Sequence, residues 1–262
     1  MNLVVLVKQV PETTDVKIDR ETNTLIREGV SSIVNPFDMY AVEQALRIRD
    51  EHGGKVTCIS MGPPQAEAAL RETLSLGADE AILLSDKAFA GADTLATSYT
   101  LAKAILKLGE FDLVICGKQA IDGDTAQVGP GVAEHLDIPH VTYVSKVEKI
   151  SDRHIRVRRM TEEGYDVILS SLPALITVVR EVGEPRMPSI KGTLRARKAQ
   201  IATWTAKDIE ADEMMLGLSG SPTQVMRIFS PEARPGGEII EGDSPCEKAM
   251  NLLARLKASH SI

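Results

Sequence analysis

The sequence predicts an α/β fold in which helices cover both faces of a doubly wound, mostly parallel sheet. Apolar runs of strand length at 3–7, 56–60, 81–84 and 113–116 alternate with segments in which apolar residues recur at helical spacing. Such alternation of strands and helices is typical of parallel sheets. The run at 3–7 is continuously apolar, which indicates a strand that is buried on both faces.

Capping residues indicate where the helices of this sheet begin and end. Asn35 followed by Pro36 suits the start of a helix, and the pair Gly53-Gly54 ends it. Asp93 can cap a further helix. Helices are also predicted over 65–76 and from about 125 to 136, and short strands near 16–18 and 24–26.

The pattern changes after residue 136. Strand-like segments without intervening helices, at 141–147, 155–159, 166–170 and 174–178, predict an antiparallel extension of the sheet. After Gly183 the chain is rich in proline and glycine, and only 248–257 is strongly helical in pattern. We therefore expect an α/β domain over 1–183 and an arm over 184–262 that lies on a partner. The alternative for the arm is a partly disordered linker.

The composition argues against several classes of protein. The 262 residues carry a net charge of −7 and only 3% aromatic residues, which disfavours nucleic-acid binding through phosphates or stacked bases. Three scattered cysteines without a C-x-x-C pair argue against zinc binding and are expected to be buried. No apolar stretch approaches the roughly 20 residues of a membrane span, so we expect a soluble, cytoplasmic protein.

The most informative segment leaves the strand at 113–116 and enters the helix expected from about residue 125. It consists of Gly117, Lys118, Gln119, Ala120, Ile121, Asp122, Gly123, Asp124, Thr125, Ala126, Gln127 and Val128. Ligands bind at this edge of open α/β sheets. The N–H groups of 125–127, placed in a first helical turn, would form an anion site, and the two aspartates suit ribose hydroxyls or a helix cap. The structural alternative is a capped loop without a ligand.

Other strand ends are predicted to meet at the same edge. Lys8 follows the first strand, Met61-Gly62 closes the second, Asp93-Thr94 begins one helix and Asn35 begins another. Each of these alone is ordinary, as a turn, a cap or a surface lysine. Together they predict a nucleotide cleft.

Motifs of common catalytic sites are absent from the sequence. The chain has no G-x-G-x-x-G fingerprint, no G-x-x-x-x-G-K-[ST] phosphate loop, no G-x-S-x-G elbow and no H-E-x-x-H pair. Its five histidines have no acid or nucleophile at a telling spacing. The sequence therefore predicts a cofactor carrier rather than a hydrolase, with no catalytic residue and no metal ligand.

Five segments occur in the order seen in one family. They are Val7-Lys8-Gln9-Val10-Pro11, Asn35-Pro36-Phe37-Asp38, Met61-Gly62-Pro63, Gly77-Ala78-Asp79 and the segment 117–128. On these residues the chain resembles electron-transfer flavoprotein β subunits over essentially its whole length. The resemblance implies a Rossmann-like, adenine-nucleotide-binding fold and a heterodimer with an α subunit that carries FAD on a mobile domain.

The resemblance also implies which residues hold a nucleotide. Most β subunits of this family bury AMP, whereas a minority hold a second FAD in the same cleft. The nucleotide-binding candidates are Leu6, Lys8, Asn35, Met61, Gly62, Cys116 and all residues of 117–128, with Asp93 and Thr94 near the phosphates.

A partner-recognition loop of the family matches 186–192 in this chain. The candidate partner-binding residues are Met187, Pro188, Ser189, Ile190, Lys191, Arg195 and Arg197. An exposed isoleucine between proline and glycine, beside cations, is a plausible apolar anchor with a charged rim. The alternative is that Ile190 packs under its own loop.

Three hypotheses for the function remain open at this point. In the first, the sequences of 61–64, 91–98 and 217–225 look like those of NADH-oxidising, electron-bifurcating members of the family. In such members FAD in this subunit delivers electrons to ferredoxin or flavodoxin and, through the α-subunit FAD, to an acyl-CoA dehydrogenase-type partner. Small residues at Gly91 and Ala92 would leave space for a flavin ring. The second hypothesis is a non-bifurcating carrier with structural AMP, and the third is a stand-alone nucleotide-binding or nucleotide-hydrolysing domain.

One departure from the family pattern is visible. Mitochondrial-type relatives carry a glutamate on the strand where this chain has Arg159-Met160. A role of that acid in electron transfer therefore does not carry over to this chain.

Overall fold

The computed structural model describes residues 1–12, 18–19, 24–25, 32–226 and 236–262. By its internal contacts the chain divides into two units, Met1–Met226 and Arg227–Ile262. The larger unit contains the sheet and all residues predicted to bind a nucleotide. The described part of the smaller unit, 236–262, contains helix α6 (Pro245–Ala258), over the stretch where the sequence predicts a helix at 248–257.

A nine-stranded sheet runs through the larger unit in the order β11-β10-β9-β12-β8-β1-β6-β7-β13. Its centre is parallel, because β1 pairs with β6 and β8, β6 pairs with β7, and β8 pairs with β12. The parallel strands are β1 (Asn2–Leu6), β6 (Lys55–Met61), β7 (Glu80–Leu84), β8 (Leu113–Gly117), β12 (Ala174–Val178) and β13 (Ala202–Trp204). The prediction of a mostly parallel α/β sheet is confirmed.

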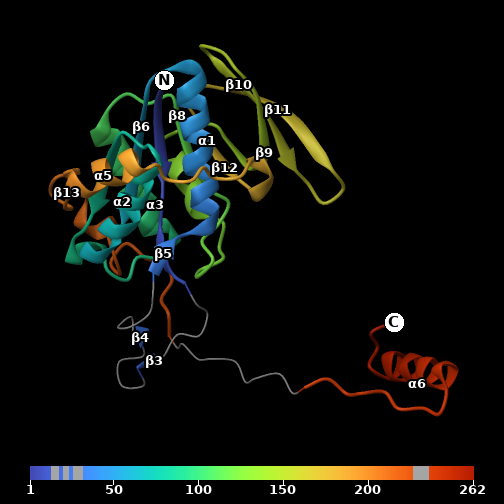
Figure 1. Cartoon of the computed structure of the whole chain (residues 1–262). Helices are drawn as coiled ribbons and strands as arrows, with labels where there is room; N and C mark the ends of the chain where they lie inside the picture. Colours follow the sequence, from blue (N-terminus) through green and yellow to red (C-terminus); the bar gives the residue numbers. More distant parts are fainter. Residues whose placement is uncertain (13–17, 20–23, 26–31, 227–235) are drawn as a thin grey trace. The chain divides into compact units, whose positions relative to one another are not determined.

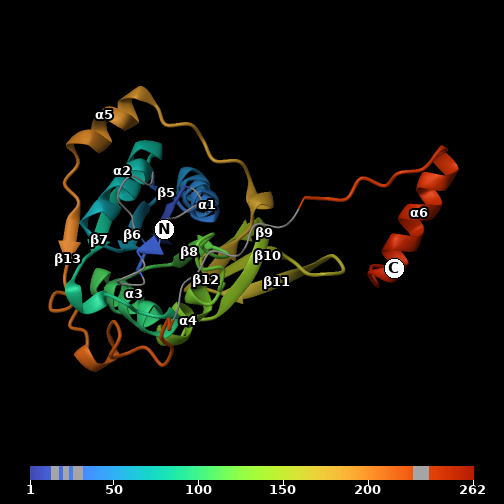
Figure 2. The same ribbon diagram turned by 90° about the horizontal axis from the view of Figure 1, so that it is seen from below.

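Helices cover both faces of the sheet (Figure 1 and Figure 2). On one face, α1 (Pro36–His52) and α2 (Glu67–Leu76) pack on the side chains of Leu3 and Val5. On the other face, α3 (Thr94–Leu108) and α4 (Val128–His135) pack on Val4 and Leu6. Successive residues of β1 therefore belong to two separate hydrophobic cores, as the continuous apolar run predicts.

The predicted helix ends are largely as expected. The Asp93 carboxylate accepts the N–H groups of Leu95 and Ala96 and so caps α3. Gly53, at positive φ, ends α1 and its N–H donates to the carbonyl of Arg49. The helix predicted over 65–76 is a 3₁₀ turn (Pro64–Ala66) followed by α2.

The antiparallel extension consists of β9 (His140–Ile150), β10 (His154–Met160) and β11 (Tyr165–Ser171). The prediction that 174–178 belongs to it is wrong. This segment is β12, which lies between β8 and β9 and is parallel to both. All five of its residues are buried, so its continuous apolar sequence has the character of a central strand, not of a strand with one solvated face.

The expectation that the chain is irregular after Gly183 is wrong for the stretch 190–204. Helix α5 (Ile190–Lys198) packs on α2, and β13 pairs with β7 at the edge of the sheet. Ser189 caps α5, since its hydroxyl accepts the N–H of Gly192. The compact unit consequently extends to Met226 and includes the first part of the segment expected to form an arm.

Short elements complete the described structure. β2 (Gln9–Pro11) pairs with β5 (Ser32–Val34), and β3 (Ile18–Asp19) pairs with β4 (Thr24–Leu25). The strands predicted near 16–18 and 24–26 fall partly outside the described residues. Three further 3₁₀ turns lie at Lys87–Phe89, Arg180–Val182 and Glu213–Met215 in the described residues. Among the described residues, no helix combines the length and apolar character that crossing a membrane requires.

Two leucine truncations distinguish the central position of β12 from the edge position of β11. Leu175 is fully buried in β12, whereas Leu169 in β11 is 66% exposed. We expect Leu175→Ala to lower the free energy of unfolding by about 2–5 kcal/mol because it leaves a cavity. The matched control Leu169→Ala should change it by no more than about 0.5 kcal/mol. Urea denaturation of the purified chain measures both, and similar losses for the two variants would contradict the strand order.

Candidate functional site

The predicted site residues meet where β1 and β8 end. Leu6 and Cys116 are the buried final or penultimate residues of these two strands, and Lys8 and Gly117 stand at their carboxyl ends. β1 and β8 are neighbours, with Leu6 opposite Cys116. Burial raises the pKa of the Cys116 thiol, so this side chain is an uncharged lining group, not a nucleophile.

Asn35 fastens the loop that follows β8. Its side-chain N–H donates to the carbonyl of Gln119 over 2.8 Å, and its side-chain oxygen accepts the N–H of Ile121 over 3.1 Å. The residue is fully buried. The expected side-chain cap on α1 is therefore wrong, because the amide is used to hold the loop.

Asp38, in the first turn of α1, binds the carboxyl ends of β1 and β8. Its carboxylate accepts the N–H of Lys8 over 2.8 Å and the N–H of Gly117 over 3.2 Å. A Cβ at position 117 would lie 2.5 Å from this carboxylate, so the contact requires glycine. Burial raises the pKa of Asp38 to about 7, although hydrogen bonds from Asn35, Lys8 and Gly117 oppose the shift.

The loop reaches its helix three residues later than predicted. Asp124 and Ala126 have φ of 53° and 55°, which is incompatible with a right-handed helix, and α4 begins at Val128. Thr125, Ala126 and Gln127 are thus not in a helical turn, and the reason given for an anion site there is wrong. Within the described part of the chain, however, the N–H groups of these three residues meet no protein acceptor.

One ion pair and two hydrogen bonds organise the exposed side of the loop. The ammonium of Lys8 lies 2.7 Å from the Asp122 carboxylate. The side-chain amide of Gln119 donates to the Asp124 carboxylate, and the N–H of Asp124 donates to the carbonyl of Ala120. Both aspartates are therefore held by this chain's own donors, and both remain exposed.

Helix α3 contributes hydroxyl groups beside the loop. The Thr94 hydroxyl donates to the Gln127 side chain over 2.9 Å, and the Ser98 hydroxyl donates to the carbonyl of Val128 over 3.2 Å. Helices α3 and α4 also pack on each other, so that Gly131 must be small to clear Ser98. The structure thereby brings Thr94 next to the segment 125–128, as the nucleotide-cleft prediction requires.

Asp93, in contrast, is occupied by protein groups. Besides capping α3, its carboxylate accepts the N–H of Thr223 over 3.0 Å and the Thr223 hydroxyl over 2.8 Å. Burial alone would raise the pKa of Asp93, but these hydrogen bonds hold it below its ordinary value. The side chain of Leu218 packs against Gly91: a Cβ at position 91 would lie 2.7 Å from Leu218 Cγ. The space expected beside Gly91 is thus filled by the segment after 216.

Lys118 is held between two aromatic rings. Its ammonium lies 5.0 Å from the ring centre of Phe37 and 5.5 Å from that of Tyr143. Tyr143 has φ of 58°, a conformation that is strained for an aromatic residue and that interrupts the β9–β12 register. Met61 is the last residue of β6, and the N–H of Gly62, which follows it, donates to the carbonyl of Leu84.

The candidate partner segment lies away from the nucleotide loop, between β12 and α5. Met187 and Ile190 are 88% and 84% exposed, so Ile190 does not pack under its own loop. Lys191 and Arg197 are exposed on α5, whereas the Arg195 guanidinium donates to the carbonyl of Leu74 on α2 and to that of Ala78 just after α2. The exposed Arg195 side chain therefore also satisfies carbonyl groups at the C-terminal end of α2.

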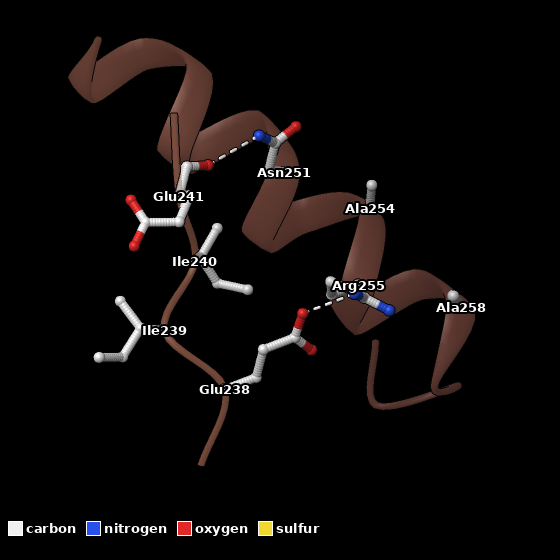
Figure 3. A pocket seen from close by; sticks show the side chains of 8 residues that line it. All are labelled: Glu238, Ile239, Ile240, Glu241, Asn251, Ala254, Arg255 and Ala258. Atoms are coloured by element: carbon white, nitrogen blue, oxygen red, sulfur yellow. Dashed lines mark hydrogen bonds and ion pairs between the residues drawn. The ribbon is translucent and has the colours of Figure 1, made fainter. Parts of the chain in front are cut away.

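The smaller unit has a groove of its own. Ile239 and Ile240 lie beside α6, where Glu241 accepts a hydrogen bond from Asn251 and Glu238 pairs with Arg255 (Figure 3). Cys246, on α6, is exposed, so the expectation that all three cysteines are buried is wrong for this one. Among the described residues, no cluster of histidine, cysteine and acidic side chains is arranged to hold a metal ion.

Comparison with known proteins assigns the chain to a family. Residues 22–209 match the electron transfer flavoprotein domain. The chain belongs to the electron transfer flavoprotein family. It is 56% identical to the electron transfer flavoprotein subunit beta of Thermoanaerobacterium thermosaccharolyticum and 51% identical to that of Clostridium acetobutylicum. It is also 52% identical to the caffeyl-CoA reductase-Etf complex subunit CarD of Acetobacterium woodii, and each comparison covers 100% of both chains.

The site of this electron transfer flavoprotein chain has donors that fit a nucleotide. Exposed backbone N–H groups at 125–127 suit phosphate oxygens, and the Thr94 hydroxyl lies beside them. Gly123 has no heavy atom within 4 Å of a built Cβ, so a ligand can approach its backbone. Sequence reasoning missed Asp38 as the residue that holds the base of this site.

The raised pKa of Asp38 gives the flavoprotein chain a specific pH dependence. An aspartate with a pKa of about 7 when folded and 3.8 as the ordinary value binds a proton more tightly in the folded state. Stability from this group is therefore lost as pH rises from about 4 to about 7. Asp38→Asn removes the ionisation, so between pH 5 and 8 the wild type should lose about 3 kcal/mol more unfolding free energy than the variant.

Denaturation with urea at several pH values measures this difference. Asp166→Asn, at an exposed position of β11, is the matched control and should follow the wild-type pH curve. Parallel curves for the wild type and Asp38→Asn would show that Asp38 does not titrate in this range.

Proposed function

We propose that this chain is the β subunit of a heterodimeric electron transfer flavoprotein that binds FAD at the carboxyl ends of β1 and β8. NADH is the electron donor, and the electrons are divided between ferredoxin or flavodoxin and the FAD of the α subunit. The α subunit then serves an acyl-CoA dehydrogenase-type flavoenzyme. A bound flavin supplies the ability to take up two electrons together and to release them singly.

The observation that carries the proposal is the loop after β8. Asn35 and Asp38 fix its base, the Lys8–Asp122 pair holds its outer side, and the N–H groups of 125–127 are left for a ligand. A loop that is held in this way need not be ordered by the ligand, which lowers the entropic cost of binding. The residues of this chain thus bind and orient the nucleotide and take no part in breaking bonds.

The relatives support the electron-transfer part of the proposal. One of them is named as a subunit of a caffeyl-CoA reductase-Etf complex, so that relative is named together with an enzyme that acts on a CoA ester. The exposed side chains of Met187 and Ile190, with Lys191, Arg195 and Arg197 on α5, suit a docking segment for that flavoenzyme. Met250 and Leu252 are exposed on α6, which suits burial against the α subunit.

A second candidate is the carrier that holds AMP in place of FAD. The filling of the space beside Gly91 by Leu218 favours it, because a flavin ring needs more room next to the loop than AMP does. In that case the nucleotide is structural, and the chain presents the docking segment without reacting with NADH.

Counting the released cofactors distinguishes the two candidates. The chain is co-produced with its α subunit, the purified heterodimer is denatured, and FAD and AMP are separated by chromatography. Two FAD and no AMP per heterodimer are expected for the bifurcating carrier. One FAD with one AMP would overturn the FAD assignment and the NADH chemistry, and leave the AMP-holding carrier.

A matched pair of asparagine truncations tests the position of the nucleotide. Asn35→Ala removes both bonds to the loop, and we expect the heterodimer to retain about tenfold less nucleotide in this subunit, since losing a buried hydrogen-bond pair costs about 1–3 kcal/mol. Asn2→Ala, at the opposite end of β1, should retain the wild-type amount. Equal nucleotide content in the two variants would argue against a site at this loop.

A further inference from the structure

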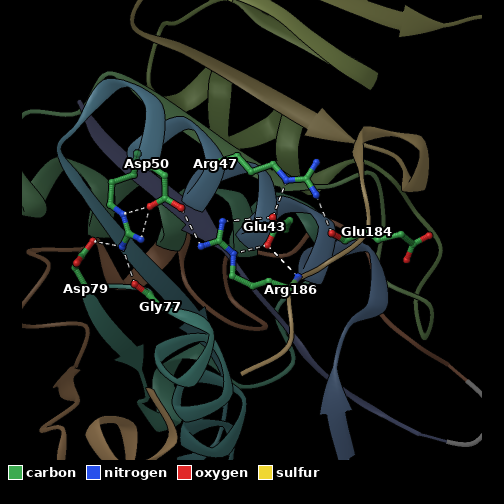
Figure 4. A network of polar contacts seen from close by, with 8 residues as sticks. Glu43, Arg47, Asp50, Gly77, Asp79, Glu184 and Arg186 are labelled. Atoms are coloured by element: carbon green, nitrogen blue, oxygen red, sulfur yellow. Dashed lines mark hydrogen bonds and ion pairs between the residues drawn. The ribbon is translucent and has the colours of Figure 1, made fainter. Parts of the chain in front are cut away.

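The chain before α5 is tied to α1 by a buried acid (Figure 4). The Glu43 carboxylate accepts the backbone N–H of Arg186 over 3.0 Å and its side-chain Nε over 2.8 Å. Arg47, one turn further along α1, donates to Glu43 over 2.6 Å and to the carbonyl of Glu184 over 2.9 Å. The two α1 side chains therefore hold the two ends of the stretch 184–186, Arg47 at Glu184 and Glu43 at Arg186.

Glu43 is the centre of this set of contacts. Its side chain is only 5% exposed, whereas those of Arg47 and Arg186 are 46% and 33% exposed. Burial would raise the pKa of Glu43, but hydrogen bonds from Arg186 and Arg47 outweigh it and lower the pKa. The carboxylate is thus charged and paired, which is the arrangement that a buried acid requires.

Arg186 is also held from a second side. Its Nη1 lies 2.9 Å from the Asp50 carboxylate, and Asp50 in turn pairs with Arg49 over 2.8 Å. Arg49 continues the network to the carbonyl of Gly77 and to Asp79, at the end of α2. The base of the segment is therefore joined to α1 and, through α1, to the turn that follows α2.

The other end of the segment is fixed by α2. The Arg71 guanidinium donates to the carbonyl of Ala196 over 2.7 Å, and Arg195 donates to the carbonyl of Leu74 over 3.0 Å. A Cβ on Gly192 would lie 2.3 Å from the carbonyl oxygen of Ser75, so α5 touches α2 backbone to backbone there. Residues 187–191 thus bridge two anchored ends while Met187 and Ile190 project into solvent.

We propose that Glu43 is a positioning residue for docking of the flavoenzyme partner: it holds Arg186 so that Met187 and Ile190 are presented in one fixed arrangement. This inference rests on the proposed function of the segment 187–191 as the docking surface. A surface that is ordered before binding does not lose that freedom on binding, and so binds more tightly.

The central variant is Glu43→Gln in the assembled heterodimer. It keeps the size of the side chain but removes the charge that pairs with Arg186. If the docking-competent arrangement falls to about a tenth of the molecules, the KM for a purified acyl-CoA dehydrogenase of the same organism should rise about tenfold with kcat unchanged. Hydrogen exchange at the amide of Arg186 and its neighbours should become about tenfold faster for the same reason.

Matched variants separate this inference from the proposed function. Glu148→Gln is the control, since Glu148 on β9 also accepts bonds from two arginines, Arg156 and Arg158, but lies outside the network of Glu43. Ile190→Ala tests the docking surface itself and should raise the KM without changing exchange at Arg186. Arg186→Lys is the substitute variant if the Glu43→Gln heterodimer does not assemble. It removes the contact that the Arg186 guanidinium makes with Glu43, and the same rise in KM and faster exchange are expected.

The outcomes are distinct. A raised KM for both Ile190→Ala and Glu43→Gln, with faster exchange only in the latter, supports the positioning role. A raised KM for Ile190→Ala alone overturns the role of Glu43 and leaves the docking surface in place. An unchanged KM for Ile190→Ala overturns the docking function, and the role of Glu43 in docking with it.

Discussion

The amino end of α1 holds the candidate site together. Asp38 binds the N–H groups that follow β1 and β8, and Asn35 binds the loop beyond β8 at two points. These contacts join strand ends that are distant in sequence to one helix terminus. The base of the loop 117–127 therefore takes its shape from α1, while Lys8 and Thr94 hold its outer residues Asp122 and Gln127.

The same helix also holds the candidate docking segment 187–191 in place. Glu43 lies little more than one turn after Asp38 and binds the segment that leads into α5. One element thus sets the place of both the nucleotide loop and the exposed Met187 and Ile190. Because both contacts come from one short stretch of α1, the fold itself fixes the distance between the loop 117–127 and the segment 187–191.

Sequence reasoning found the parallel centre of the sheet and most of the residues at its carboxyl edge, because apolar runs and helix caps are local signals. It missed contacts made between distant segments. The insertion of β12 beside β8 depends on pairing across some sixty residues, although its unbroken apolar sequence was a usable signal. Asp38 was visible too, since it lies one turn before Ala41 and Val42 on the buried face of α1. The positive φ of Asp124 and Ala126, which delays α4, had no such signal.

The pairing of β13 with β7 leaves one strand edge uncovered while the protein is being synthesised. β7 is an apolar strand whose outer edge is covered only when residues 202–204 add to it. During synthesis, more than a hundred residues must leave the ribosome after β7 before that cover arrives. An uncovered apolar strand edge is a template for pairing with other chains, so the nascent protein is most exposed to aggregation in this interval.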